Sequence, residues 1–251
     1  MITTLLWDLD NTLLDFPSAE RQALIATFAD FTLGPCSPDL LVRYSALNAR
    51  WWRRLEEGDV TKAELLPGRF REFFADEGIA CTEYDAFNAA YQHHLGDTIV
   101  FLDNGYELVK DLHGQVKQYL VTNGSLQAQT RKLKRSGLGE LFDGVFISEV
   151  VGAEKPSRAF FDAVLSAIGP VDKEELLLIG DSLTSDMAGG CGAGIPCCWY
   201  DPKGLPVPED LPIRHTIQNL NEIPSILAAH RSVKSLREIR VDFSFQRTII
   251  T

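Results

Sequence analysis

The sequence has no long apolar run and comparatively few positive charges. None of its hydrophobic stretches approaches the length of about 20 residues that a helix needs to cross a bilayer. It also lacks a basic N-terminal segment followed by a signal-peptide core, so we expect a cytoplasmic protein with no membrane association. The 24 lysines and arginines stand against 35 acidic residues, a net charge of -11, which argues against binding of nucleic acid polymers. This charge still permits a small phosphorylated substrate.

The cysteines also lack the spacing of disulfide or zinc sites. There is no CxxC pair and no Cys/His zinc pattern, and their number is odd: Cys36, Cys81, Cys191, Cys197 and Cys198. Buried free thiols in a reducing compartment fit this pattern best. With 45% hydrophobic and 24% charged residues, the chain can bury a sizeable core, as one large domain or one domain with an insert.

Short apolar runs recur along the chain at the intervals of an α/β protein. We expect five buried strands, within the segments TTLLWD, VKQYLV, GVFIS, ELLLIG and IPCCWY. Helix-like segments separate these runs from the second one onward. This alternation predicts a doubly wound parallel sheet.

The long segment between the first two runs has helical periodicity instead. Apolar residues fall on one helical face at Leu40, Tyr44, Leu47, Trp51 and Leu55. Thr61 and Glu64 match a capping box, and Thr82 and Asp85 match one more loosely, so two further helices are expected to begin there. The aromatic residues of this helical bundle, including Trp51 and Trp52, are interpreted as packing rather than as a substrate platform.

Two aspartates interrupt the end of the first apolar run. Asp8 and Asp10, in LLWDLDNTLLD, are two residues apart, so on an extended chain both project to the same side. They could simply reach water at a strand end. Like charges held together repel unless a cation or a shared proton relieves them, which also indicates a divalent metal site or an acid/base pair.

Polar segments follow three of the other predicted strands. These segments are TNG at Thr122–Gly124, EKP at Glu154–Pro156 and GDSLTSD at Gly180–Asp186. Each alone could be a turn, a solvated loop or a helix start. Since the carboxyl ends of parallel strands meet in one crevice, the four motifs in this order predict a single site.

This order of motifs resembles that of the haloacid dehalogenase (HAD) superfamily of phosphohydrolases, in the group with a helical C1 cap inserted after the first motif. The resemblance covers roughly residues 1–230. It implies a Rossmann-like catalytic core formed by residues 1–15 and 99–230, and a cap formed by residues 16–98. It also implies Mg²⁺ as cofactor and an aspartyl-phosphate intermediate.

The resemblance implies a catalytic or phosphate-binding role for five residues. Asp8 corresponds to the nucleophile and Asp10 to the general acid/base. Thr122 and Asn123 are expected to bind phosphate, and Lys155 to bind phosphate and stabilise its charge. Such chemistry divides a difficult hydrolysis into two displacements, provided that charge on the phosphoryl oxygens is neutralised.

The same resemblance implies a metal site at the strand ends. Asp8, Asp181 and the backbone carbonyl of Asp10 are the expected Mg²⁺ ligands, with waters completing the coordination of about six oxygens. Thr12 and Asp186 are expected to support the site. The Asp10 side chain then stays free for proton transfer.

Several activities remain open within this fold. The segment Tyr44–Phe70 and the segment FISEVVGAEKP are similar to the bacterial pyrimidine 5'-nucleotidase subfamily, which implies pyrimidine nucleoside monophosphates as substrates. A sugar phosphatase or phosphomutase is the alternative. A metal-free 2-haloacid dehalogenase is disfavoured by Asp10, and a non-catalytic regulator by the presence of every motif residue. One departure from the family is Asp103–Gly105, where relatives carry a Pro-Gly pair.

Other candidate features fit structural roles better. The adjacent His93 and His94 would diverge on a helix and are expected at the surface. GGCGAG, residues 189–194, lacks the GxGxxG spacing and is expected to allow close helix packing. The charges of ARWWRRLEEG, residues 49–58, are expected in water.

The end of the chain has the period of a strand. Within the C-terminal extension, residues 231–251, apolar Ile239, Val241, Phe243 and Phe245 alternate with polar residues and share one face. The alternative is a frayed tail. We expect this C-terminal extension to pair with a sheet edge, of its own chain or of a neighbouring protomer. Whether the protein is a monomer or a homodimer is left open.

Overall fold

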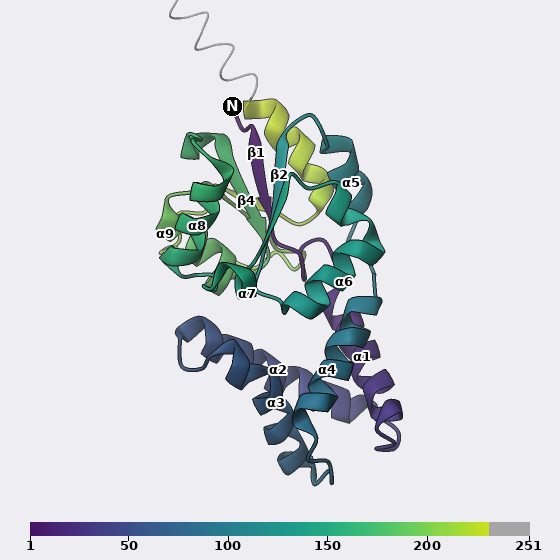
Figure 1. Ribbon diagram of the computed structural model, residues 1–251. Coiled ribbons are helices and arrows are strands. Elements are labelled where there is room, and N and C mark those ends of the chain that lie inside the picture. Colours follow the sequence, from purple (N-terminus) through teal and green to yellow (C-terminus); the bar gives the residue numbers. More distant parts are fainter. Residues whose placement is uncertain (231–251) are drawn as a thin grey trace, which may run out of the picture.

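The computed structural model describes residues 1–230, so the expected C-terminal edge strand lies outside the described residues. A parallel sheet of six strands forms the core, in the order β3-β2-β1-β4-β5-β6 (Figure 1). The strands are β1 (Thr4–Trp7), β2 (Lys117–Thr122), β3 (Gly144–Ile147), β4 (Leu176–Gly180), β5 (Cys197–Tyr200) and β6 (His215–Ile217). The prediction of a doubly wound parallel sheet is confirmed.

Two strands differ from the sequence prediction. β6 was not expected, because its three residues HTI are too short to form an apolar run. β3 was expected to be buried, but it is the edge strand next to β2, and Val145 is 38% exposed there. The sequence pattern alone does not distinguish such an edge strand from a central one.

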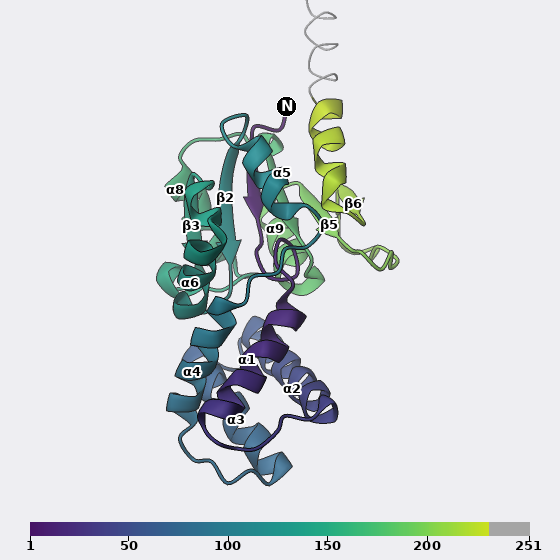
Figure 2. The same cartoon turned by 90° about the vertical axis from the view of Figure 1, so that its right-hand side faces the viewer.

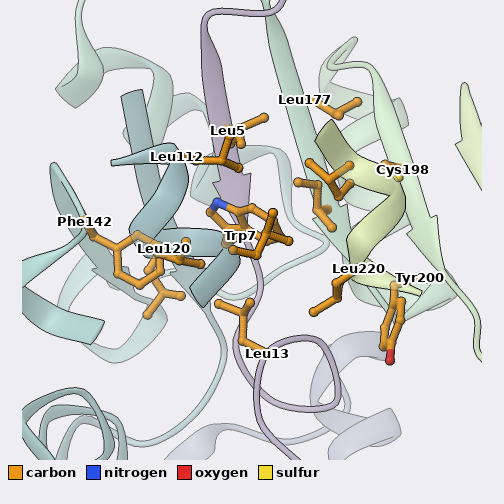
Figure 3. Packing of buried hydrophobic residues seen from close by; sticks show 14 of the residues in the cluster. Leu5, Trp7, Leu13, Leu112, Leu120, Phe142, Leu177, Cys198, Tyr200 and Leu220 are labelled. Carbon is orange, nitrogen blue, oxygen red and sulfur yellow. The ribbon is translucent and has the colours of Figure 1, made fainter. Parts of the chain in front are cut away.

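Helices cover both faces of the sheet. One face packs against α5 (Gly105–Leu112), α6 (Leu126–Ser136) and a C-terminal helical segment, residues 223–230. The other face packs against α8 (Arg158–Ile168) and α9 (Ala188–Ala193), while the short α7 (Ser148–Val151) follows β3. Figure 3 shows Trp7 of β1 at the centre of the first cluster, between Leu120 and Leu220. Leu6, the neighbour of Trp7 on β1, lies in the cluster on the other face, because successive side chains of a strand point to opposite sides.

The GGCGAG segment has the packing role that the sequence indicated. A Cβ atom on Gly189 would lie 2.4 Å from the Phe161 ring, and one on Gly190 would lie 2.5 Å from the Cys197 sulfur. Glycine is therefore required where α9 approaches α8, at Gly189, and where it approaches the sheet, at Gly190. All five cysteines are free; three are buried, whereas Cys36 and Cys191 are only half-buried.

Four helices form the cap at the carboxyl end of the sheet (Figure 2). They are α1 (Phe16–Asp30), α2 (Pro38–Glu57), α3 (Lys62–Glu77) and α4 (Tyr84–Asp97). Their interior is aromatic, with T-shaped pairs such as Phe70–Phe87 at 4.8 Å and Phe74–Phe87 at 4.8 Å. Such pairs add to the stabilisation that burial of the rings provides.

The starts of the cap helices were only partly predicted. The capping box at Thr61 is confirmed, since Thr61 N–H donates to Glu64 Oε2 at 2.8 Å. The one at Thr82 is wrong, because α4 begins at Tyr84 without a side-chain cap. Helix α1 was not predicted at all. It buries Glu20 while exposing Ile25, so its sequence shows no continuous apolar stripe.

Two antiparallel linkers join cap and core. Asp15 N–H donates to the Val100 carbonyl at 2.8 Å, and Leu102 N–H donates to the Leu13 carbonyl at 3.0 Å. Asp103, at the start of the segment that departs from the family pattern, has a φ of 46°. Its carboxylate accepts hydrogen bonds from the Tyr200 hydroxyl and from the Leu220 N–H.

No helix within residues 1–230 is both long and apolar enough to span a membrane.

Candidate active site

The predicted motifs meet in one pocket between the core and the cap, with a volume of about 400 Å³. The predicted site residues that line it are Asp8, Asp10, Thr122, Asn123, Lys155, Asp181 and Asp186. Thr12 lies behind the pocket wall, where its hydroxyl donates to Asp8 Oδ2 at 3.0 Å. The topology therefore brings all of them together, while their chemical roles stay predictions.

Asp8 is held from three sides at the end of β1. Its N–H donates to the Ile179 carbonyl at 2.9 Å, and its Oδ1 accepts from Lys155 Nζ at 2.7 Å. The side chain is buried, with a residue exposure of only 6%. Burial raises the pKa of Asp8 to about 7 against the opposing effect of Lys155, and the negative charge of Asp186 adds to the increase.

Lys155 is the positive centre of the site and is 1% exposed. Its Nζ donates to Asp8 and to Asp186 Oδ1, both at 2.7 Å, and to the Val121 carbonyl at 3.0 Å. Burial by itself lowers the pKa of this ammonium, but the carboxylates of Asp186 and Asp8 outweigh it and raise the pKa. Lys155 therefore stays charged within the core.

Asn123 has contacts that the sequence did not indicate. Its side-chain Nδ2 donates to the Lys155 carbonyl, and its Oδ1 accepts from the Lys155 N–H, each at 2.8 Å. The amide thus fixes the backbone that carries Lys155. Asp186 is engaged as well, since its Oδ2 accepts from the Ser182 N–H at 3.2 Å.

Three carboxylates could hold a metal ion. One oxygen each of Asp8, Asp181 and Asp186 lies within 4.8 Å of the others. Burial, followed by the charges of Asp8 and Asp186, raises the pKa of Asp181 well above its ordinary value. Lys155 offsets one of these negative charges, so the excess favours a divalent cation with oxygen ligands.

The cluster includes Asp186, which was expected only to support the site, and it leaves out the Asp10 side chain, which was expected to stay free. The carboxylate of Asp10 turns toward α6, where Lys132 Nζ lies 2.5 Å from Oδ1 and Gln129 Nε2 lies 2.9 Å from Oδ2. Sequence reasoning missed both α6 residues. The available signal was their place beside Ala128 and Leu133 on the inward face of α6, an unusual position for a lysine.

The cap supplies the opposite wall of the pocket. Its lining residues are Phe16, Pro17, Glu20, Ser45, Asn48, Ala49, Trp52, Arg53 and Glu56. The interpretation of both tryptophans as packing holds only for Trp51, whose ring fills the space beside Gly68. Trp52 lies on the pocket wall. Arg53 is exposed as expected but also faces the pocket, because α2 turns this side toward the core.

A buried polar network supports the cap wall. Asn48 Nδ2 donates to Glu20 Oε1 at 2.8 Å, and Asn48 Oδ1 accepts from Arg69 Nη1 at 2.7 Å. Arg69 Nη2 also donates to Asn88 Oδ1 at 3.1 Å. Burial raises the pKa of Glu20. These contacts fix which way the Asn48 amide points at the pocket.

Lys62, at the start of α3, connects the cap to the core. Its Nζ donates to the Asn123 carbonyl and Ser148 Oγ at 2.6 Å each, and to Glu154 Oε2 at 2.9 Å. The side chain is 8% exposed. Burial lowers the pKa of Lys62 despite the opposing charge of Glu154.

The adjacent histidines of α4 lie where expected, since His93 is half-exposed and His94 pairs with Asp30 at the surface.

Comparison with known proteins identifies the family. Residues 2–194 match the haloacid dehalogenase-like hydrolases. The chain belongs to this family. Its relatives include the HAD-hydrolase YfnB of Bacillus subtilis, which is 36% identical over 92% of this chain and 97% of the relative.

Two further relatives of this HAD-like hydrolase are pyrimidine 5'-nucleotidases. YjjG of Escherichia coli is 30% identical over 89% of this chain and 97% of its own length. PynA of Streptococcus pneumoniae is 36% identical over 80% of this chain and 84% of its own length. The magnesium-bound crystal structure of Bacillus subtilis YfnB matches with a TM-score of 0.84 and 34% identity, covering 90% of this chain and 98% of that one.

Proposed function

We propose that this HAD-like hydrolase is a magnesium-dependent phosphomonoesterase that acts on pyrimidine nucleoside monophosphates. The observation that carries the proposal is the placement of Asp8 between Lys155 and Thr12, in the lining of a pocket shared with Asp10 and Thr122. This is the set that attack by a carboxylate on phosphorus requires: a fixed nucleophile, a buried cation and a neighbouring acid/base.

Two displacements make up the proposed reaction. A carboxylate oxygen of Asp8 attacks phosphorus, and the departing alkoxide takes a proton from Asp10. Asp10 then accepts a proton from the water that attacks the aspartyl-phosphate, which releases inorganic phosphate and restores Asp8. Lys155 binds the phosphoryl oxygens and offsets their charge, while Thr122 donates a hydrogen bond to them.

Magnesium suits the acidic cluster described above. Asp8 and Asp181 would hold it, with the Asp10 carbonyl, and Asp186 would support Lys155 and bound waters. When bound, the ion supplies further neutralisation of phosphoryl charge. Support comes from the three carboxylates within 4.8 Å and from the magnesium-bound structure of the YfnB relative.

The choice of a pyrimidine nucleotide rests on the relatives and on the cap wall. YjjG and PynA are pyrimidine 5'-nucleotidases. Phe16 and Trp52 line the pocket with aromatic rings, and Asn48 lines it with a fixed amide. A pocket of this size is within the range of small-molecule sites.

A phosphomonoester panel tests the proposal. Phosphate release is measured with and without magnesium for pyrimidine and purine nucleoside monophosphates, their di- and triphosphates, and sugar phosphates. Pyrimidine monophosphates should give the largest kcat/KM. Preference for sugar phosphates would establish the alternative function, and halide release from 2-chloropropionate would contradict phosphatase chemistry.

A further inference from the structure

Helix α6 presents two buried polar side chains to Asp10. Its N-terminus is capped by Ser125, whose Oγ accepts from the Ala128 N–H at 3.2 Å. Gln129 and Lys132 follow one turn apart, so they share the inward face of the helix. Lys132 is 1% exposed and Gln129 is fully buried.

Both oxygens of the Asp10 carboxylate are engaged by these side chains. Lys132 Nζ lies 2.5 Å from Oδ1, and Gln129 Nε2 lies 2.9 Å from Oδ2. Lys132 forms no ion pair with another carboxylate within residues 1–230. Burying a charged lysine costs free energy unless a partner compensates its charge. Asp10 is the carboxylate that compensates Lys132 here.

Gln129 also ties Asp10 to the phosphate-binding loop. Its Nε2 donates to Thr122 Oγ1 at 2.7 Å in addition to Asp10. Its own Oε1 is buried with no hydrogen-bond partner in the described part of the chain. The amide thus serves these two acceptors while leaving its oxygen unpaired.

The glycine of the TNG motif is explained by the same side chain. A Cβ atom on Gly124 would lie 2.1 Å from Gln129 Nε2 and 2.4 Å from Cδ. Any larger residue would displace the Gln129 amide from between Asp10 and Thr122. Gly124 and Gln129 therefore depend on each other.

We propose that Lys132 and Gln129 are positioning residues that orient the Asp10 carboxyl group for proton transfer to the leaving oxygen. The inference rests on the proposed function, since Asp10 needs a fixed orientation only if it exchanges protons with a substrate. A misplacement of about 1 Å at such a group can cost on the order of a hundredfold in rate.

The leaving group separates this role from a merely structural one. A nucleoside leaves as an alkoxide that needs a proton, whereas p-nitrophenyl phosphate releases a stable phenolate that needs little help. Lys132→Met should lower kcat/KM for the nucleotide by about tenfold or more, but for p-nitrophenyl phosphate by less than about threefold. Gln129→Met should give the same pattern with a smaller loss.

Matched variants control for folding and charge. Lys134→Met removes an exposed lysine from the same helix and should match the parent on both substrates. Lys132→Arg keeps the positive charge and should restore part of the nucleotide activity. Melting temperatures measured for each variant establish that the comparison is made between folded proteins.

A double-mutant cycle tests whether Lys132 acts through Asp10. The rate of nucleotide hydrolysis is measured in single-turnover reactions, with enzyme in excess over the nucleotide. In an Asp10→Asn background, Lys132→Met should lower this rate little further. Additive losses, equal losses on both leaving groups, or full parental activity of Lys132→Met would each overturn the inference while leaving the proposed function intact. A parent protein that hydrolyses no phosphomonoester with magnesium would overturn both.

Discussion

The core and the cap each bury a lysine beside the pocket, and the two lysines differ in the number of carboxylates that they contact. Lys155 of the core contacts two carboxylates, which raise its pKa. Lys62 of the cap contacts one carboxylate and two neutral oxygens, and burial lowers its pKa. The number of compensating charges, rather than burial alone, decides the outcome.

This difference indicates a division of labour. The core gathers three carboxylates and a lysine at the strand ends, as phosphoryl transfer requires, whereas the cap wall combines aromatic rings and an amide with the charged side chains of Glu20, Arg53 and Glu56. Loss of a charge at these strand ends should therefore stop the reaction, whereas loss of a cap contact should change substrate capture or selectivity.

The strongest test of this division is Asp8→Asn. Removing the proposed nucleophile should lower turnover by a factor on the order of 10⁵ or more, as expected for residues that act as a unit. Phosphate release from the preferred substrate measures the loss. The melting temperature should not fall, since a neutral amide at this position relieves charge repulsion within the acidic cluster. Activity above roughly a tenth of the parent would remove Asp8 from the mechanism.

Magnesium removal should act on the acidic cluster of the core, where the proposed ligands lie. Chelation should abolish turnover, and added magnesium should restore it. Binding to the folded state should also raise stability, by about 2.7 kcal/mol at a hundredfold excess over Kd. Thermal unfolding with and without magnesium measures this shift. Asp181→Asn should remove it, and an unchanged shift in this variant would place the metal elsewhere.

A cap variant should have an intermediate effect. Lys62→Met removes the contacts of α3 with the Asn123 carbonyl, Ser148 and Glu154, so kcat/KM for the nucleotide should fall by about tenfold. The kcat/KM for the smaller substrate p-nitrophenyl phosphate should fall less. Steady-state kinetics measure both.

The control for this variant is a lysine remote from the cap. Lys117→Met removes an exposed lysine of β2 that pairs with Asp143, and it should leave both substrates unaffected. If Lys62→Met also matches the parent, contact between cap and core through this residue is irrelevant to turnover.

The smallest effect is expected for selectivity. Asn48 and Asn88 both contact Arg69, but Asn48 lines the pocket and Asn88 does not. Asn48→Ala should lower the ratio of kcat/KM for pyrimidine over purine monophosphates by about threefold to tenfold, the value of one or two hydrogen bonds. Asn88→Ala should leave the ratio unchanged. A similar shift in both variants would indicate a stability effect of the Arg69 network.

Three of the four core motifs were predictable because each lies at or directly after the end of a strand, whereas the EKP motif comes after the short α7 that follows β3. Asp8 follows β1, Thr122 ends β2, and Asp181 follows β4, so the parallel sheet alone brings them to one edge. The cap was predictable only as helices. The sequence did not predict which face of the cap lines the pocket. Trp52 was assigned to packing because the spacing of aromatic residues does not show whether a helical face packs against another helix or lines a pocket.

By itself, the sequence determined the parallel sheet, the helical insert and the four motifs, since these depend on local periodicity and on residues at or shortly after strand ends. Only the tertiary structure decided the contacts of Lys132 and Lys62. Lys132 lies 122 positions from Asp10, and Lys62 lies 92 positions from Glu154. No local pattern encodes such pairs, because they arise when whole helices dock and a buried charge must find its partner there.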